Sequence, residues 1–400
     1  MCALWRTPQR WQYAKTTPPS THSSIRRQWL ITSVLVLCFS VPFLLFRVNP
    51  VHKIHGWLAP PAPPPPPSPP PEILEPEIYR NQPKHPGFYD WQTNSSFDPI
   101  QIPNVQDKSL DQLCASFPRH LLEDIQPVLK TGHGVLDARV RPHLHGVSAC
   151  LTNLLIFSDT AEHFEGRDFI NSFEYIPPVL ADEAPELEAY RNGSLADGTA
   201  SRKAGWKVDK FKFIVSTTQA WKMRPGNKWY VFYEADTYIV WDNMFRLLAQ
   251  FDPDMPWYFG SPTQGRDKTW FANGGPGMVL SREAMRQLTI KDYDQNTGEY
   301  RGPNLLRKQW DFLLHDCCGD SVLGWSLWEK NITLSGLWPH FNPWPAHHVP
   351  FEDSQWCQPV ITMHKPTEED LLGLWRWQFE HRENEVSLPL PCTLRICVNL

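Results

Sequence analysis

The sequence predicts an α/β fold, and three observations lead to that prediction. From residue 151 onward, short apolar runs typical of buried strands alternate with longer segments of helical periodicity. The strongest apolar run, residues 229–233, ends at two acids, Glu234 and Asp236, and ligands of α/β proteins bind where strands leave the sheet. About 290 residues follow a proline-rich segment, which is long enough for one large α/β domain.

The N-terminal segment has the pattern of a membrane anchor. Residues 1–28 contain basic residues and no acid, and residues 29–46 are uncharged and mostly apolar. A span of about 18 residues is near the lower limit for crossing a bilayer, and short spans suit early secretory membranes. We therefore predict a cytosolic tail over 1–28, a transmembrane signal anchor over 29–47 and a lumenal remainder, as in a single-pass type II protein. A cleaved signal peptide is the alternative, but no clear cleavage site follows the apolar run.

Proline dominates the segment that follows the predicted anchor. Residues 60–71 hold ten prolines in twelve positions, which favours an extended polyproline II rod. A binding site for a partner domain is the alternative, although the usual readers of such motifs are cytosolic. We predict a Pro-rich lumenal stem over 48–108 and a catalytic domain over 109–400.

Cysteine usage agrees with a lumenal domain. Seven of the nine cysteines lie beyond the predicted anchor, and in an oxidising lumen we expect disulfides, with Cys114 and Cys150 as our first pair. The odd number leaves a thiol that is free or shared between two chains, which allows a homodimer. A zinc site is not expected, because no paired C-x-x-C spacing occurs. Glycosylation sequons begin at Asn94, Asn192 and Asn331.

The overall composition limits the classes of ligand. A net charge of -5 without long basic clusters gives no support for nucleic-acid binding. The 19 tryptophans agree with a carbohydrate ligand, because aromatic rings stack on sugars, although they also fill ordinary cores.

The first elements of the alternating region carry polar residues at their ends or along one face. Residues 154–157 form a strand pattern that ends at Ser158 and Asp159, the place of a first nucleotide-contacting strand. After a long variable insert, residues 205–222 have helical spacing and carry Lys207 and Lys210. These lysines either reach a diphosphate or lie on a solvated helix face.

The acids after the next strand point to a metal. A sheet core rarely accepts acids unless they are paired, hydrogen-bonded or metal-bound. Carboxylate oxygens at a strand end suit Mg²⁺ or Mn²⁺, which in turn hold a diphosphate. The alternative is an acidic first turn of the following helix, whose buried stripe is Trp241, Phe245 and Leu248.

A glycine-rich turn follows another short strand at 256–260. In residues 273–281 (NGGPGMVLS), Gly274 and Gly275 allow the backbone to approach a ligand closely. The turn has neither the Lys-Ser/Thr of a P-loop nor dinucleotide-binding spacing. Ser281 is expected to begin a helix.

Asp320 stands ahead of an apolar helix in residues 315–328 (HDCCGDSVLGWSLW), with Asp316 shortly before it. Its role is either to cap that helix or to act as a general base toward an acceptor hydroxyl. Downstream, His340 lies in a loop, and Thr367 with Asp370 has the spacing of a capping box that opens a final helix.

Together these residues resemble the fringe-like and core-1 β-1,3-galactosyltransferase-like glycosyltransferases of family 31, in the fungal branch. The resemblance covers roughly residues 150–365, and the anchor and stem match the usual layout of that family. Four motifs carry it: Trp206-Lys207, EADTY at 234–238, NGGPGMVLS at 273–281 and GDSVLGW at 319–325.

The resemblance implies a GT-A fold, a Rossmann-like mixed sheet flanked by helices, in a Golgi membrane protein with a lumenal catalytic domain. It implies a UDP-sugar donor, Mn²⁺ or Mg²⁺, a glycan or glycoprotein acceptor, and transfer of galactose or a related hexose with inversion and in β-1,3 linkage. It assigns Asp320 as the base, and Asp236 and His340 as metal ligands with His364 as the competing histidine. We further predict Asp159, Lys207, Glu234, Gly274 and Gly275 as donor-binding residues.

One departure from the family pattern keeps other functions open. The usual Asp-Asp-Asp is Glu-Ala-Asp here, so the first acid is longer and the middle acid is missing. A catalytically inactive sugar-binding relative or chaperone of the same fold is therefore an alternative. A glycoside hydrolase with two carboxylates is another, but it does not explain the glycine-rich motif.

Overall fold

The computed structural model describes residues 104–290, 292–293, 300–301, 304–338, 340–348 and 360–380. All of these lie in the second of two units of the chain, Glu72–Leu400. The predicted cytosolic tail, the membrane anchor and all but the last few residues of the stem fall outside the described residues. Within the described ranges, no helix combines the length and apolar character needed to cross a membrane.

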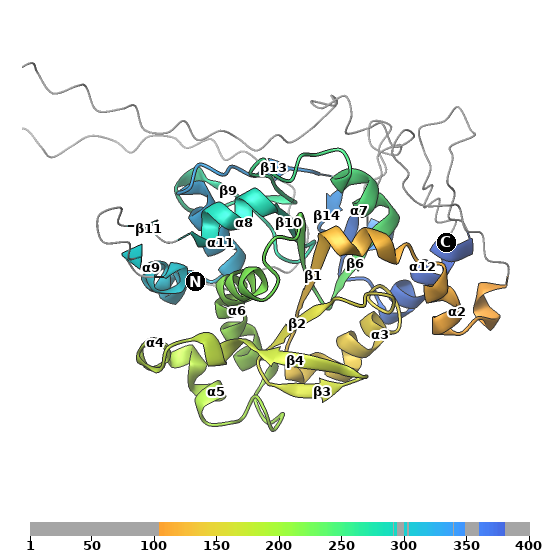
Figure 1. Cartoon of the computed structure of the whole chain (residues 1–400). Coiled ribbons are helices and arrows are strands. Elements are labelled where there is room, and N and C mark those ends of the chain that lie inside the picture. Colours follow the sequence, from red (N-terminus) through yellow and green to blue (C-terminus); the bar gives the residue numbers. More distant parts are fainter. Residues whose placement is uncertain are drawn as a thin grey trace, which may run out of the picture. The chain divides into compact units, whose positions relative to one another are not determined.

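A central mixed sheet of eight strands organises the domain (Figure 1), in the order β13-β7-β10-β5-β1-β2-β4-β3. Strand β1 pairs in parallel with β2 and β5, whereas β10 is antiparallel to β5 and β7. The mixed α/β sheet confirms the predicted fold class. The strands are β1 (Ile125–Lys130), β2 (Leu155–Ser158), β3 (Glu162–Phe164), β4 (Arg167–Asn171), β5 (Trp229–Glu234), β7 (Tyr258–Gly260), β10 (Met278–Ser281) and β13 (Ser335–Gly336).

The strand order reverses between β1 and β5, and this reversal determines where polar side chains gather. Strands β2 and β4 lie on one side of β1, and β5 lies on the other. Because β1, β2 and β5 are parallel, their carboxyl ends share one edge, where Lys130 is in register with Glu234. Ligands of open α/β sheets bind in the crevice at such a switch point.

Strand β1 is a correction to the predicted element order. The sequence pattern predicts residues 154–157 as the first nucleotide-contacting strand, but this segment is β2, and β1 precedes it at the centre of the sheet. All six residues of β1 are buried. Gln126, Pro127 and Lys130 obscured its apolar pattern, since proline in particular is rare in central strands.

Two apolar cores cover the two faces of the sheet. Alternate residues of β5 divide between them, with Trp229, Val231 and Tyr233 in one core and Tyr230 and Phe232 in the other. In Figure 1, α6 and α11 lie on one side of the central strands, and α3 and α12 lie on the other. The first core is covered by α2 (Leu110–Ala115), α3 (Arg141–Leu144), α7 (Trp241–Leu248) and α12 (Glu368–Glu380), and the second by α6 (Arg202–Met223), α8 (Arg282–Thr289) and α11 (Gly319–Trp328).

A smaller sheet has the strand order β14-β15-β6, and its strand β6 follows β5 in the sequence. Strand β6 (Thr237–Ile239) begins directly after Asp236, and β15 (Thr362–His364) pairs with it so that His364 faces Thr237 in register. The backbone N–H of Lys365 also donates to the carbonyl of Asp236 at 2.8 Å. A segment more than a hundred residues downstream is thereby held against the acidic turn.

The remaining described elements are short. The segment predicted as a variable insert folds into β3, β4, α4 (Pro178–Glu183) and α5 (Glu188–Arg191). The others are β8 (Pro262–Gln264), β9 (Trp270–Ala272), β11 (Asp292–Tyr293), β12 (Tyr300–Arg301), β14 (Phe341–Asn342), α9 (Leu305–Lys308), α10 (Trp310–His315), and the 3-10 and π turns η3 (Val105–Asp107), η4 (Arg119–Asp124), η5 (His133–Val135), η6 (Leu136–Val140), η7 (Ser172–Tyr175), η8 (Pro185–Leu187), η9 (Arg266–Lys268) and η10 (Ala346–His348).

Several local predictions are confirmed. The Ser281 hydroxyl caps α8 by accepting from the N–H of Ala284 at 3.1 Å. Thr367 and Asp370 form the reciprocal bonds of a capping box. A disulfide joins Cys114 of α2 to Cys150, as predicted.

Candidate functional site

Glu234, Asp236 and His364 meet at the carboxyl end of β5. Glu234 is the last residue of β5, Asp236 stands in the turn to β6, and His364 ends β15. Their potential ligand atoms all lie within 4.8 Å of one another, and His364 Nε2 is 3.6 Å from Asp236 Oδ1. Two carboxylates and an imidazole are donors that suit Mn²⁺ or Mg²⁺.

A buried oxygen of Asp236 also fits a metal ligand. Asp236 is 7% exposed, and its Oδ1 atom accepts no hydrogen bond from the described residues. Buried carboxylate oxygens normally have a hydrogen-bond partner or an ion. The donor set and this oxygen together fit a divalent cation.

The glycine-rich turn packs directly against these side chains. A Cβ atom on Gly275 would lie 2.2 Å from His364 Cε1, so only glycine fits there. The Thr237 hydroxyl fixes this contact, because it donates to the carbonyl of Gly275 at 2.6 Å and accepts from the N–H of Glu234 at 3.0 Å. The turn therefore approaches the candidate metal ligands closely, and its approach to a donor stays a prediction.

Asp320 contacts the same turn from the other side. The N–H of Gly274 donates to Asp320 Oδ2 at 2.7 Å, and the N–H of Ser321 donates to Asp320 Oδ1 at 2.9 Å. Burial raises the pKa of Asp320 to about 6; the Gly274 amide opposes this rise, and the negative charge of Glu234 adds to it. A carboxyl group with this pKa can exchange a proton near neutral pH.

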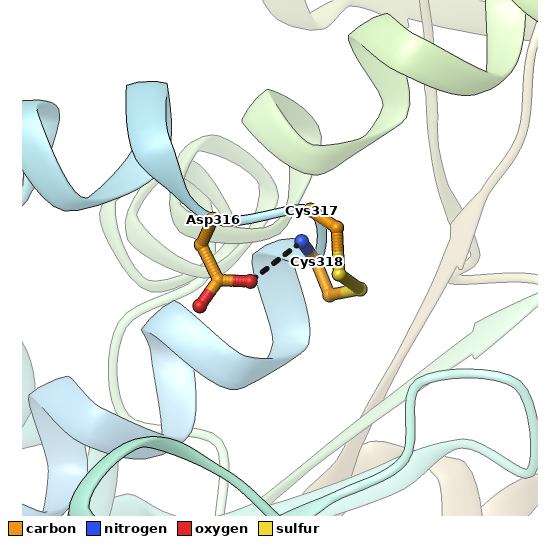
Figure 2. Close-up of side chains that lie close together, drawn as sticks. All are labelled: Asp316, Cys317 and Cys318. Carbon is orange, nitrogen blue, oxygen red and sulfur yellow. Dashed lines mark hydrogen bonds between the residues drawn. A yellow bond between two sulfur atoms is a disulfide. The ribbon is translucent and has the colours of Figure 1, made fainter. Parts of the chain in front are cut away.

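Asp320 does not occupy the N-cap position of its helix. Asp320 is the second residue of α11, and Cys318 occupies the N-cap position. Asp316 Oδ1 accepts from the N–H of Cys318 at 2.9 Å (Figure 2), and the Ser321 hydroxyl donates to Asp316 Oδ2 at 3.2 Å. Asp316 therefore orders the turn before α11, and the helix has no side-chain cap at Cys318.

Cys317 and Cys318 form a disulfide between adjacent residues, which the sequence analysis did not predict (Figure 2). Asp316, Cys317 and Cys318 also group as potential metal ligands. Because both sulfur atoms belong to the disulfide, neither offers a thiolate, and we assign no metal here. The disulfide instead restrains the backbone that leads to Asp320.

A buried network of opposite charges connects Asp159 to Glu234. Lys212 Nζ lies 3.3 Å from Asp159 Oδ2 and 3.6 Å from Asp209 Oδ1. Asp209 also pairs with Lys130, whose Nζ lies 3.1 Å from Glu234 Oε1. Both lysines are nearly inaccessible to solvent, so each buried charge has an opposite partner.

The network and its neighbours give the two candidate metal-ligand carboxylates, Glu234 and Asp236, different acidities. Burial raises the pKa of Glu234, and Lys130 only partly offsets it while Asp209 and Asp236 add to it. Burial also opposes ionisation of Asp236, but His364, Arg139 and Lys130 outweigh it and lower its pKa to about 2. Asp236 is therefore ionised at any physiological pH.

Two predicted site residues lie outside this cluster. Lys207 is exposed on α6, whereas Lys210 is buried and contacts Glu186 and two carbonyl groups. His340 is fully buried, and its carbonyl accepts from the N–H groups of Ile361 and Thr362. The geometry therefore favours His364 over His340 as the histidine ligand.

Sequence reasoning missed four charged residues that contact the site, namely Lys130, Arg139, Asp209 and Lys212. A signal existed for Lys212, which stands between Phe211 and Phe213 and follows a helical apolar pattern. A lysine in such a stripe is buried only when it is paired. No comparable signal marked the others, because their partners come from distant segments.

Comparisons with known proteins agree with the motifs. A family model described as Fringe-like matches residues 192–304. The chain is 38% identical over 96 residues to glycoprotein-N-acetylgalactosamine 3-beta-galactosyltransferase 1 of Xenopus laevis, covering 23% of this chain and 24% of that protein. It is 29% identical over 85 residues to the Fringe glycosyltransferase of Drosophila melanogaster, covering 17% of this chain and 20% of that protein.

These similarities are regional. The chain spans about a quarter of the length of the first relative and a fifth of the second. The matched range 192–304 contains Glu234, Asp236, Gly274 and Gly275 but ends before Asp320. The assignment of Asp320 therefore depends on the structure and on the sequence motif around it.

Proposed function

We propose that this chain is a fringe-like glycosyltransferase of family 31, as its regional similarities indicate, and that it transfers a hexose from a UDP-sugar to a hydroxyl of a glycan or glycoprotein. One observation carries the proposal: two successive glycines contact the two halves of the site. Gly275 abuts His364 of the candidate metal cluster, and the Gly274 amide binds the carboxylate of Asp320. The candidate metal site, which would hold the diphosphate of the donor, and the proposed general base, which would act on the acceptor hydroxyl, thus lie beside one glycine-rich turn.

Each residue has a defined role in this proposal. Glu234, Asp236 and His364 would hold Mn²⁺ or Mg²⁺, which supplies positive charge to a departing diphosphate. Asp320 takes the proton of the acceptor hydroxyl as the sugar is transferred with inversion in a single displacement. Lys130 holds the longer Glu234 side chain in place.

The finer features follow from the relatives and from the sequence. The printed name of the Xenopus protein supports galactose as the sugar and a β-1,3 linkage. We also propose that residues 29–47 anchor the protein in the Golgi membrane with the catalytic domain in the lumen, and that it belongs to the fungal branch.

A catalytically inactive relative is the second candidate function. One observation favours it: both acids of the altered Glu-Ala-Asp motif already have cationic partners, Lys130 for Glu234 and Arg139 for Asp236. Such a protein would bind a nucleotide or a sugar without turnover.

The test is release of free nucleotide from a panel of UDP- and GDP-sugars by a secreted fragment covering residues 75–400. We expect one UDP-sugar to be hydrolysed slowly with Mn²⁺, and this activity to disappear with a chelator and in Asp236→Asn. Asp168→Asn is the control, because the Asp168 side chain is 93% exposed and contacts only His163 among the described ion pairs. Metal-dependent UDP binding without turnover of any donor would support the inactive relative instead.

A further inference from the structure

Arg139 forms an ion pair with the carboxylate of Asp236, which is the principal candidate for binding a metal ion. Its Nη1 donates to Asp236 Oδ2 at 2.6 Å. The other oxygen, Oδ1, faces His364 Nε2 at 3.6 Å and accepts no hydrogen bond from the described residues. The guanidinium thus neutralises Asp236 where a divalent ion would otherwise do so.

A divalent ion and this ion pair oppose each other. An ion held by Glu234, Asp236 and His364 would share the Asp236 carboxylate with the guanidinium. Two positive charges on one carboxylate repel each other strongly in a partly buried site. The ion also removes the negative charge that holds Arg139. Binding of the ion therefore favours release of Arg139 from Asp236.

Arg139 is the more exposed of the two basic side chains that pair with Glu234 and Asp236. Its side chain is 49% exposed and projects from the short π-helical turn η6. Lys130 differs, because its side chain is 8% exposed and is held by Asp209 and Glu234 together. A change in ion occupancy is therefore expected to displace Arg139 and to leave Lys130 in place.

We propose that Arg139 competes with the divalent ion for Asp236 and, once displaced, binds the diphosphate of the nucleotide beside that ion. A guanidinium forms paired hydrogen bonds with phosphate oxygens, which makes it a suitable partner. The second half of this inference rests on the proposed function, since it assumes a nucleoside diphosphate as ligand. The first half concerns the protein and the ion alone.

The two halves predict effects of opposite sign for Arg139→Gln. Without nucleotide, the variant binds Mn²⁺ about tenfold more tightly than wild type, because its competitor is gone. At saturating Mn²⁺, it binds UDP about tenfold more weakly, because a phosphate partner is gone. A residue with a merely structural role would weaken both.

The measurement uses the full-length protein in detergent, with free Mn²⁺ followed by electron paramagnetic resonance and UDP binding by calorimetry. Arg139→Lys is expected to restore competition with Mn²⁺ but not full UDP affinity. Arg141→Gln is the matched control, because Arg141 lies two residues away and pairs with Asp137 and Glu165 instead. Near-ultraviolet circular dichroism confirms that each variant is folded.

Unchanged or weaker Mn²⁺ binding by Arg139→Gln would overturn the competition, and unchanged UDP binding would overturn the phosphate contact. If wild type and variant both fail to bind Mn²⁺ while turnover survives a chelator, the competition is wrong and a metal-independent transferase remains. If the opposite-sign effects appear but no donor is turned over, the competition holds and the transferase proposal fails.

Discussion

Two carboxylates near the end of β5, those of Asp236 and Asp320, differ in how readily each holds a proton. The pKa of Asp236 is lowered to about 2, because His364, Arg139 and Lys130 outweigh its burial. The pKa of Asp320 is raised to about 6, chiefly by burial. Environments that separate the pKa values of neighbouring acids suit them to different roles, and we propose that Asp236 is a permanent anion and Asp320 a proton acceptor.

The pH dependence of turnover tests the role of Asp320. A base must be deprotonated, so kcat/KM should rise with pH up to about 6 and level off above it. Ionisation of Asp236 cannot produce this rise of kcat/KM with pH, because the pKa of Asp236 lies near 2. In Asp320→Asn we expect kcat to fall by about 10² to 10⁴. Full kcat in this variant would remove the base assignment.

A stability measurement separates this role from misfolding. Because the folded-state pKa of Asp320 lies above its ordinary value of 3.8, its ionisation lowers the free energy of unfolding as pH rises through about 6. Asp320→Asn should therefore gain stability relative to wild type as pH rises from about 4 to about 6, and should keep that gain without further change above it. Asp311→Asn is the control for both measurements, since the Asp311 side chain is 94% exposed.

At the scale of elements, the sequence predicts those whose pattern is local. Strand β5, helix α7 and the Ser281 cap were predictable because their alternation, helical stripe and capping hydroxyl lie within a few residues. Strand β1 was not, since its burial depends on strands β2 and β5, which come later in the chain. The choice of His364 likewise required the pairing of β15 with β6.

The contact between the glycine-rich turn and β15 gives an element-scale prediction. In Gly275→Ala, the new Cβ would lie 2.2 Å from the His364 ring, so the turn or β15 must shift. We expect Mn²⁺ affinity to fall at least tenfold, measured by paramagnetic resonance. Gly205→Ala is the control, because nothing lies within 4 Å of its new Cβ, and alanine favours helix α6 by up to about 1 kcal/mol. Equal Mn²⁺ affinity in both variants would contradict the account.

For the whole molecule, the predictable part is the α/β class and the edge of the sheet where the site lies. The sequence pattern placed Glu234 and Asp236 at a strand end, and the reversal of strand order between β1 and β5 makes that end a crevice. The pairing of the buried charges was not predictable, since Lys130 ends strand β1 whereas its partner Asp209 comes from helix α6. Their pairing depends on the complete sheet.

The most direct test is a crystal structure with UDP and Mn²⁺, with anomalous scattering recorded at the manganese absorption edge. The account predicts one strong peak between Glu234, Asp236 and His364, in contact with the diphosphate. A peak bound by other residues, or bound UDP without any manganese peak at these three side chains, would contradict it.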